Sequence, residues 1–279
     1  MSATSTIAYA GEPGAFAEDA AIAVAAVSRR LAVAGFGEVF EAVESEAADL
    51  GVAPIENLVN GTVREILDLL LTHRLRIVGE VVVPVRLCLA ALPGQSLDEI
   101  ERVYSHVQAL GQAEAFLRSR PWTLLSTYNT AGSGKLIADR DERRAAAVLS
   151  PRAAAQYGLE ILVDEIGDVA GNRTRFLVLG RQADDPLPGA AGAPRRTTLV
   201  FGVRNEPGTL LAALRAFADE GVNLSRLESR PSRDRPWEYV FFTDADADAS
   251  SPVCARALDA LRAVATSVRV FGSYARAEG

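Results

Sequence analysis

The chain has 279 residues, of which 49% are hydrophobic and 23% charged, and 29 Lys and Arg against 36 Asp and Glu give a formal net charge of −7. This composition excludes a largely disordered chain, because there is ample apolar surface to bury, and the acidic balance argues against a nucleic-acid partner, which would need a basic face. With no long uncharged apolar run, no basic N-terminal leader and only two distant cysteines and two distant histidines, we expect a cytoplasmic protein without a membrane span or a metal site.

Residues 1–182 alternate short β-rich runs with helical patterns. The predicted strands are Ile7–Tyr9, Val52–Ile55, Ile77–Leu92, Arg102–Tyr104, Leu124–Leu125, Ala146–Leu149 and Phe176–Leu179. The predicted helices include Ala15–Val27, Val63–Leu71, Gln108–Arg118 and Ala131–Ala138. Such alternation predicts α/β layers with mostly parallel strands, in which ligands bind where strands lead into helices.

Residues 183–196 read as a linker, because Pro, Gly and Ala dominate them and no periodic apolar pattern crosses them. Residues 197–279 then form a second unit. Its predicted elements are strands at Thr197–Arg204, Asn223–Ser229, Trp237–Thr243 and Val268–Tyr274, with helices at Gly208–Glu220 and Pro252–Ala265. The order βαββαβ predicts a ferredoxin-like layout.

Two polar junctions in the first part combine glycine or amide groups with a helix start. Ala10–Phe16 contains two glycines that let the backbone approach a ligand, although it could equally be only a tight turn. Glu56 and Asn57 follow an apolar strand and could orient a polar substrate. They could also serve the next helix, where Thr62 and Glu65 resemble a capping box.

Three later junctions are also polar. Gln108 and Gln112 share one helix face, and Ser105 stands where a helix cap is expected. The hydroxyl-rich stretch 126–133 opens another helix, but its Gly-Lys pair lacks the spacing of a phosphate-binding loop. In the stretch 171–176 two arginines flank Thr174, which suits a carboxylated substrate as well as it suits a solvated surface turn.

No nucleophile is paired with a base, because Ser105 and His106 are adjacent and rarely reach the required geometry. The polar groups are instead hydroxyls, amides and guanidiniums that could surround an anion. This set favours electrostatic and general-acid chemistry over covalent catalysis.

The motifs together resemble the prephenate dehydratase family over essentially the whole chain. The family's Val-Pro-Ile-Glu-Asn segment appears at 53–57, its Ser-His-Pro-Gln-Ala-Leu-x-Gln segment at 105–112, and its Asn-x-Thr-Arg-Phe segment at 172–176. The C-terminal unit resembles an ACT regulatory domain, in which 207–210 stands for the family's Gly-Ala-Leu and 228–231 matches its Glu-Ser-Arg-Pro segment. The resemblance implies a catalytic part of two α/β lobes, like a periplasmic binding protein, with the site in the cleft.

The implied reaction is loss of CO2 and of the ring hydroxyl from prephenate, which gives phenylpyruvate for phenylalanine biosynthesis without a cofactor. Thr174 would assist departure of the hydroxyl, and Ser105, Asn57 and Gln112 would orient the ring substituents. The other substrate-binding residues that the resemblance implies are Glu56, His106, Gln108, Thr130, Asn172, Arg175 and Phe176.

The ACT resemblance implies feedback regulation by L-phenylalanine, bound between copies of the domain in a homodimer or homotetramer. The implied phenylalanine-binding residues are Pro207, Gly208, Thr209, Leu210, Asn223, Leu224, Glu228, Ser229, Arg230 and Pro231. The helix that starts after Gly208 could receive the amino acid's carboxylate.

Several positions depart from the family pattern. Glu12, Ala15 and Ala17 replace Pro, Thr and Ser of the first motif, Leu58 replaces the Ser after Asn57, and Val107 replaces Pro. An alanine at position 15 also occurs in relatives that use arogenate, so arogenate stays open as the substrate. A relative that decarboxylates prephenate without dehydration, a non-catalytic amino-acid sensor and a solute-binding protein of the same lobed architecture stay open as well.

Overall fold

The computed structural model describes residues 5–26, 28–182, 192–232 and 238–277. Most of the expected linker, the last residue of the helix predicted to end at Val27, and Trp237 therefore lie outside the described residues. The chain divides into two compact units, one of residues 2–69 with 81–176 and the other of residues 70–80 with 177–279. Among the described residues, no helix has the length and apolar character needed to cross a membrane.

The first sheet has the strand order β2–β1–β3–β11–β5, with β4 added to β3. Its strands are β1 (Thr6–Ala10), β2 (Arg29–Val33), β3 (Leu50–Asn57), β4 (Gly61–Thr62), β5 (Arg76–Pro84) and β11 (Arg173–Gly180), and its helices are α1 (Phe16–Val24), α2 (Phe36–Glu44) and α3 (Arg64–Thr72). β1 pairs in parallel with β2 and β3. The end of β3 lies beside the start of β11, because the Leu58 N–H donates to the Arg173 carbonyl at 3.0 Å.

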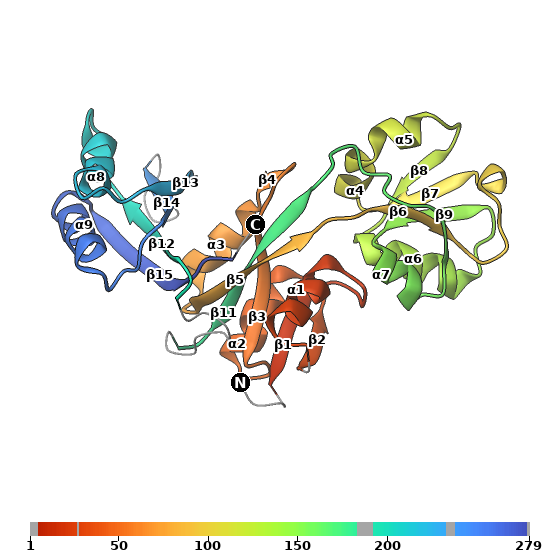
Figure 1. Ribbon diagram of the computed structural model, residues 1–279, viewed down its shortest axis with the longest axis horizontal. Helices are drawn as coiled ribbons and strands as arrows, with labels where there is room; N and C mark the ends of the chain where they lie inside the picture. Colours follow the sequence, from red (N-terminus) through yellow and green to blue (C-terminus); the bar gives the residue numbers. More distant parts are fainter. Residues whose placement is uncertain (1–4, 27, 183–191, 233–237, 278–279) are drawn as a thin grey trace. The chain divides into compact units, whose positions relative to one another are not determined.

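The second sheet has the order β10–β6–β9–β7–β8 and carries helices on both faces (Figure 1). Its elements are β6 (Cys88–Ala91), β7 (Arg102–Ser105), α4 (Val107–Gln112), α5 (Glu114–Arg118), β8 (Thr123–Ser126), α6 (Thr130–Arg140), β9 (Ala145–Leu149), α7 (Pro151–Gln156) and β10 (Glu160–Val163), with a short 3-10 helix at Leu97–Glu99. Successive residues of a strand face opposite sides. Val148 therefore packs in the core under α4 and α5, and Leu149 in the core under α6 and α7.

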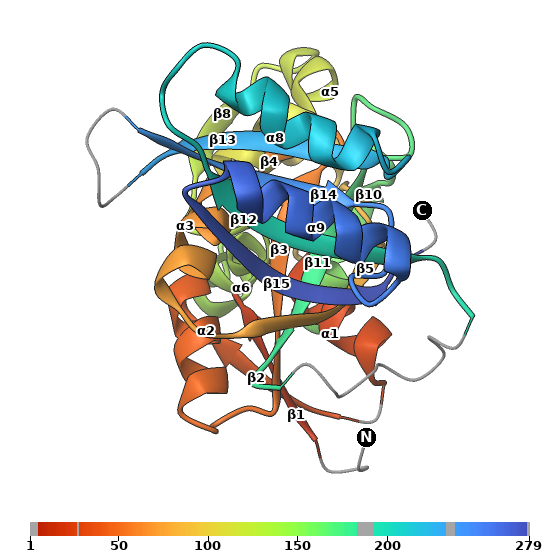
Figure 2. The same cartoon turned by 90° about the vertical axis from the view of Figure 1, so that its left-hand side faces the viewer.

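The C-terminal sheet has the antiparallel order β13–β14–β12–β15. The chain runs β12 (Arg195–Gly202), α8 (Thr209–Ala218), β13 (Leu224–Pro231), β14 (Tyr239–Ala245), α9 (Pro252–Val264) and β15 (Ser267–Ala275), which confirms the predicted βαββαβ order. Both helices cover one face, where Leu199 and Phe201 are fully buried (Figure 2). On the other face Thr198, Phe242 and Tyr274 are buried as well.

Some predicted elements differ from the observed ones. The strand predicted over Ile77–Leu92 is two strands, β5 and β6, and the helix predicted over Gln108–Arg118 is two helices, α4 and α5. The first break occurs where the Val85 N–H donates to the Asn172 carbonyl at 2.8 Å. β2, α2, α7 and β10 were not predicted. β2 is a mostly exposed edge strand that begins with two arginines, so it lacks the apolar pattern of a buried strand.

Candidate active site

Asn57 and Thr174 are joined by a hydrogen bond whose direction is fixed by the surrounding backbone. The Asn57 side-chain oxygen accepts from the N–H groups of Val59 and Asn60 at 3.0 and 2.9 Å. The amide nitrogen must therefore face β11, where it donates to the Thr174 hydroxyl oxygen at 2.9 Å. Because the Thr174 oxygen accepts this bond, its own proton is available to another acceptor.

Asn172 and Gln112 extend this contact into a buried amide cluster. The Asn57 amide also donates to the Asn172 side-chain oxygen at 2.9 Å, and the Asn172 amide donates to the Gln112 side-chain oxygen at 3.2 Å. Asn57, Asn172 and Thr174 are each less than a tenth exposed. We call Asn57, Gln112, Asn172 and Thr174 the amide cluster, and it unites four residues that the sequence motifs had placed in three separate segments.

Arg175 forms an ion pair with Glu56, at 3.1 Å between Nη2 and Oε2. Thr174 and Arg175 are neighbours on β11, and neighbouring residues of a strand point to opposite faces. The pair therefore belongs to the other face of the sheet from the Thr174 hydroxyl. Phe176, which shares the Thr174 face, is 3% exposed and packs in the interior.

The second sheet contributes a separate set of the expected residues. The Ser105 hydroxyl is fully buried and donates to the Val148 carbonyl at 2.6 Å. His106 caps α4, where its Nδ1 accepts from the Gln108 N–H at 3.3 Å. Thr130 is the first residue of α6. Of the expected residues on α4, Gln112 reaches the rest of the amide cluster through its hydrogen bond with Asn172. The hydrogen bonds of Ser105 and His106 stay within the second sheet and α4.

The first loop docks against the β9–α7 junction of the second sheet. Gly14 has a φ of +87°, and a Cβ there would lie 2.7 Å from the Cα of Ala153. Its carbonyl accepts from the Ser150 hydroxyl at 3.0 Å, and the carbonyl of Pro13 accepts from the Tyr157 hydroxyl at 2.8 Å. The glycine is therefore required for close approach of the two backbones.

Charged residues reinforce this contact. Glu12 accepts from Tyr128 at 3.0 Å and pairs with Lys135 at 3.1 Å, and burial, followed by the contact with Glu12, raises the pKa of Tyr128 to about 12. Glu18 pairs with Arg152 at 3.1 Å. We call these contacts of residues 11–18 with 128–157 the clasp. The sequence indicated only the glycines, because partners more than a hundred residues away have no local signal.

Burial opposes ionisation of Glu18, yet its pKa is lowered. The Gly14 N–H donates to the carboxylate at 2.7 Å, and Arg152 and Arg30 supply positive charge. The charged form of Glu18 is therefore the one that the folded clasp stabilises.

Comparison with known proteins identifies the family. Residues 7–184 match the model described as prephenate dehydratase, and residues 197–263 match the ACT domain. The chain belongs to the prephenate dehydratase family. This membership confirms the predicted fold class, two α/β lobes followed by a C-terminal ACT domain.

Similar proteins carry three different functional names. Arogenate dehydratase 5, chloroplastic, from Arabidopsis thaliana is 40% identical over 97% of this chain and 67% of its own length. The prephenate dehydratase of Arthrobacter aurescens, solved in complex with L-Phe, aligns at a TM-score of 0.87 with 34% identity over 97% of this chain and 90% of that one. A structure described as GqqA, a novel type of quorum quenching acylase, aligns at a TM-score of 0.88 with 32% identity over 97% of both chains.

Proposed function

We propose that this family member is a prephenate dehydratase that releases CO2 and the ring hydroxyl of prephenate to give phenylpyruvate. The observation that carries the proposal is the direction of the Asn57–Thr174 hydrogen bond. When the ring carboxylate leaves as CO2, its bonding electrons enter the ring. The C–O bond on the opposite side of the ring then breaks with its electron pair on oxygen. A proton from the Thr174 hydroxyl would let that oxygen leave as water instead of hydroxide. The Asn57 amide N–H would stabilise the charge left on the Thr174 oxygen, and a proton taken up from solvent would restore the hydroxyl.

The amide cluster would supply this proton without a charged group. Asn57 holds the Thr174 oxygen as an acceptor, and Asn172 and Gln112 hold Asn57 in place. Asn57 and Asn172 would thus act as positioning residues, and Gln112 would support them from α4. The roles expected for Glu56, Ser105, His106, Gln108, Thr130, Arg175 and Phe176 in binding or orienting the substrate stay predictions.

Arogenate is the second candidate substrate, favoured by Ala15 in the first loop and by the names of the plant relatives. It differs from prephenate in its side chain, where an amino group replaces the keto oxygen. An acylase activity is not proposed, because the Ser105 proton is held by the Val148 carbonyl and not by a base.

The test is to incubate the purified full-length protein with prephenate and with arogenate separately and to identify the products. We expect phenylpyruvate from prephenate and slower or no formation of phenylalanine from arogenate. Faster turnover of arogenate would reassign the substrate. A decarboxylated product that retains the ring hydroxyl would contradict the role of Thr174.

Regulation by L-phenylalanine is part of the proposal, and it is supported by the ACT domain and by the L-Phe complex of the Arthrobacter relative. Gly208, with a φ of +86°, precedes α8, whose first N–H groups would receive the carboxylate. Glu228 and Arg230 alternate with Ser229 along β13. Pro207, Thr209, Leu210, Asn223, Leu224 and Pro231 complete the proposed binding segments.

We expect these segments to bind phenylalanine between two copies of the ACT domain, in a homodimer or homotetramer. Calorimetry on the full-length protein measures the binding, and Arg230→Ala should weaken it while turnover persists. The absence of both binding and any effect of millimolar phenylalanine on turnover would refute the regulatory role. A cytoplasmic location stays a prediction, since the Arabidopsis relative is named as chloroplastic.

A further inference from the structure

The ACT sheet is joined to β5 by a buried ion pair. Arg196, on β12, donates through Nη1 to both carboxylate oxygens of Glu80 at 2.8 and 2.9 Å, and the two side chains are 8% and 1% exposed. The Ala277 N–H also donates to Glu80, at 3.1 Å. Arg196 also lies 3.6 Å from Asp246 through Nε, so loss of Glu80 would leave the guanidinium only this longer ion pair. Loss of Arg196 would leave the buried Glu80 carboxylate without its guanidinium, and the pair therefore connects β12 to β5.

Two further contacts tie the same strands together. Arg269, on β15, donates to the carbonyls of Leu70, Leu71 and His73 at 3.0, 3.3 and 2.7 Å, so the ACT sheet caps the C-terminal end of α3. Next to it, a Cβ on Gly272 would overlap the carbonyl oxygen of Ile77. The ACT sheet therefore packs directly against the backbone of β5 and of the C-terminal end of α3.

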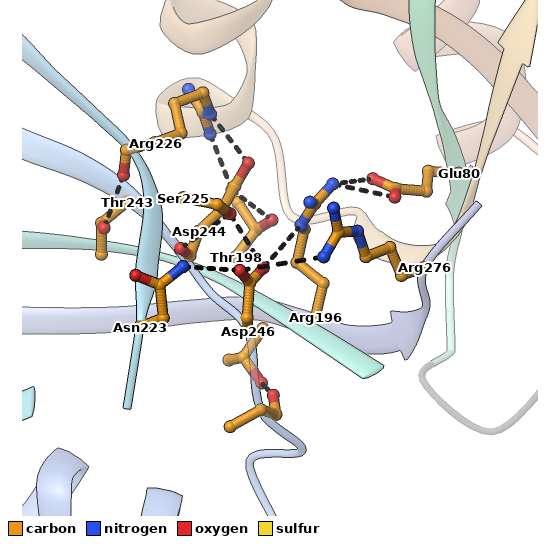
Figure 3. A network of polar contacts seen from close by, with 12 residues as sticks. Glu80, Arg196, Thr198, Asn223, Ser225, Arg226, Thr243, Asp244, Asp246 and Arg276 are labelled. Atoms are coloured by element: carbon orange, nitrogen blue, oxygen red, sulfur yellow. Dashed lines mark hydrogen bonds and ion pairs between the residues drawn. The ribbon is translucent and has the colours of Figure 1, made fainter. Parts of the chain in front are cut away.

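A charged network leads from this joint to the proposed ligand segment on β13 (Figure 3). Arg226, two residues before Glu228, donates to the Asp244 carboxylate at 2.9 and 3.0 Å, and Asp244 accepts from the Thr198 hydroxyl at 2.7 Å. Thr198 is two residues from Arg196 on β12 and therefore faces the same side of the sheet. Contacts join the two ends through Asp246, which lies 3.6 Å from Nε of Arg196 and accepts from the Asn223 amide and the Ser225 hydroxyl, each at 2.9 Å. We call Glu80, Arg196, Thr198, Arg226, Asp244 and Asp246 the charged network.

At the β13 end, the network contains a buried donor that is not satisfied. Nη1 of Arg226 has no hydrogen-bond partner among the described residues, and the side chain is only 7% exposed. A buried unpaired donor is unfavourable. Nε of Arg196, at the joint, likewise has no hydrogen-bond partner among the described residues, so each end of the network holds a donor that a small shift of the strands could satisfy.

At the other end, β5 continues from the joint to the amide cluster. Five residues after Glu80, the Val85 N–H donates to the Asn172 carbonyl at 2.8 Å. Asn172 in turn contacts Asn57, the residue that orients Thr174. Glu80 is therefore connected to Asn172 by five residues of the chain and one hydrogen bond.

We propose that the Arg196–Glu80 pair is the joint through which the ligand segment of the ACT domain controls the position of Asn172, and through it the Thr174 hydroxyl. The proposal rests on the proposed function for the identity of the reaction and of the effector. Glu80 and Arg196 are positioning residues, since neither belongs to the amide cluster or to the ligand segment. A chain truncated after Gln182 would not isolate this role, because it would also remove the cap of α3.

The experiment compares full-length wild type with Glu80→Gln, which removes the charge at nearly constant size. We expect phenylalanine to bind the variant about as it binds the wild type, and turnover without phenylalanine to persist. The effect of phenylalanine on the KM for prephenate should fall from about tenfold, a typical coupling, to about twofold or less. A variant that binds phenylalanine and keeps the wild-type response would overturn the proposal.

A second variant keeps the proposal testable if Glu80→Gln does not fold, and a control variant shows whether the effect is specific to the pair. Glu80→Met combined with Arg196→Met replaces the buried pair by apolar side chains, an exchange that folds often tolerate, and it should lose the response in the same way. Arg262→Gln removes an exposed pair with Asp259 at 2.8 Å on α9 of the same domain, and it should keep the response. Equal loss of response in Arg262→Gln would show that any change in the domain uncouples it.

Hydrogen exchange tests the joint even if wild type does not respond to phenylalanine, a result that would refute only the regulatory part of the proposed function. The Val85 amide should exchange about tenfold faster in Glu80→Gln than in wild type and Arg262→Gln, because the strand that holds it has lost its anchor. Unchanged protection of Val85 in the folded variant would contradict the joint.

Discussion

The amide cluster and the charged network both connect strands through buried polar side chains, but they use different chemistry. In the amide cluster the groups are neutral, and the Thr174 proton is not consumed by the contacts that orient it. In the charged network, guanidinium and carboxylate groups pair at 2.8–3.0 Å, while Nη1 of Arg226 has no hydrogen-bond partner among the described residues. On the proposed function, the neutral cluster keeps a proton available to a bound molecule, whereas the charged network joins β12, β13 and β14 to β5.

The most severe disruption of the amide cluster should come from Thr174→Val, which keeps volume and β-branching but removes the hydroxyl. We expect kcat to fall about a hundredfold or more with little change in KM, as for a contact made in the transition state. Thr174→Ser is the matched control and should retain kcat within about tenfold, because it keeps the proton donor. Steady-state kinetics on prephenate would contradict this role if a folded Thr174→Val protein turned over at the wild-type rate.

In the clasp, a loop and a helix are held together by close contact between their backbones. Gly14→Ala tests whether this contact stabilises the fold. An added Cβ meets Ala153 at a φ that alanine avoids, so we expect unfolding to become easier by about 2–4 kcal/mol. Gly94→Ala is the control, because its φ of +76° is similar but nothing lies within 4 Å of the added Cβ. Urea unfolding should show that Gly94→Ala lowers the free energy of unfolding by about 1 kcal/mol. Equal losses at the two positions would mean that the contact with Ala153 is unimportant.

A smaller effect is expected from the charge in the clasp. Because the pKa of Glu18 is lowered in the folded protein from its ordinary 4.5, its carboxylate stabilises the fold above that pH, and this contribution is lost as the pH falls through the lower, folded value. Glu18→Gln should lower the free energy of unfolding by about 1–3 kcal/mol at pH 7. The difference in unfolding free energy between Glu18→Gln and wild type should be smaller at pH 3, because Glu18 is then partly protonated in the wild type as well.

Unfolding curves at the two pH values provide the measurement. Glu114→Gln breaks an exposed pair with Arg118 on α5 and should change stability by about 0.5 kcal/mol or less. A Glu18→Gln deficit that is the same at pH 7 and pH 3 would show that its charge is not what stabilises the clasp.

The sequence predicted the layers of the fold because apolar periodicity is a local signal. The ACT domain was predicted element by element, although only β13 among its strands alternates between more and less exposed residues, and seven of the eight residues of β12 are buried. The sequence did not predict where a strand or helix is interrupted when the interruption depends on a contact with a distant part of the chain. The strand predicted over Ile77–Leu92 ends early because the Val85 N–H bonds to Asn172, 87 residues further along the chain.

The same limit applies to the candidate site. Asn57, Gln112 and Thr174 were found through motifs of a few residues, but the direction of their hydrogen bonds depends on the backbone of Val59 and Asn60. Glu80 and Arg196 belong to no motif. Single charged residues in a sequence are normally read as solvated, and only the folded chain brings this pair into the interior.

The most direct test of the site is a double-mutant cycle between Asn57 and Thr174, measured as kcat on prephenate. If Asn57 acts by orienting the Thr174 hydroxyl, Asn57→Ala alone should lower kcat about tenfold or more, and Asn57→Ala combined with Thr174→Val should be no slower than Thr174→Val alone, within about twofold. If the two losses instead multiply in the double variant, Asn57 and Thr174 act independently, and the hydrogen bond between them is not what prepares the proton for the leaving hydroxyl.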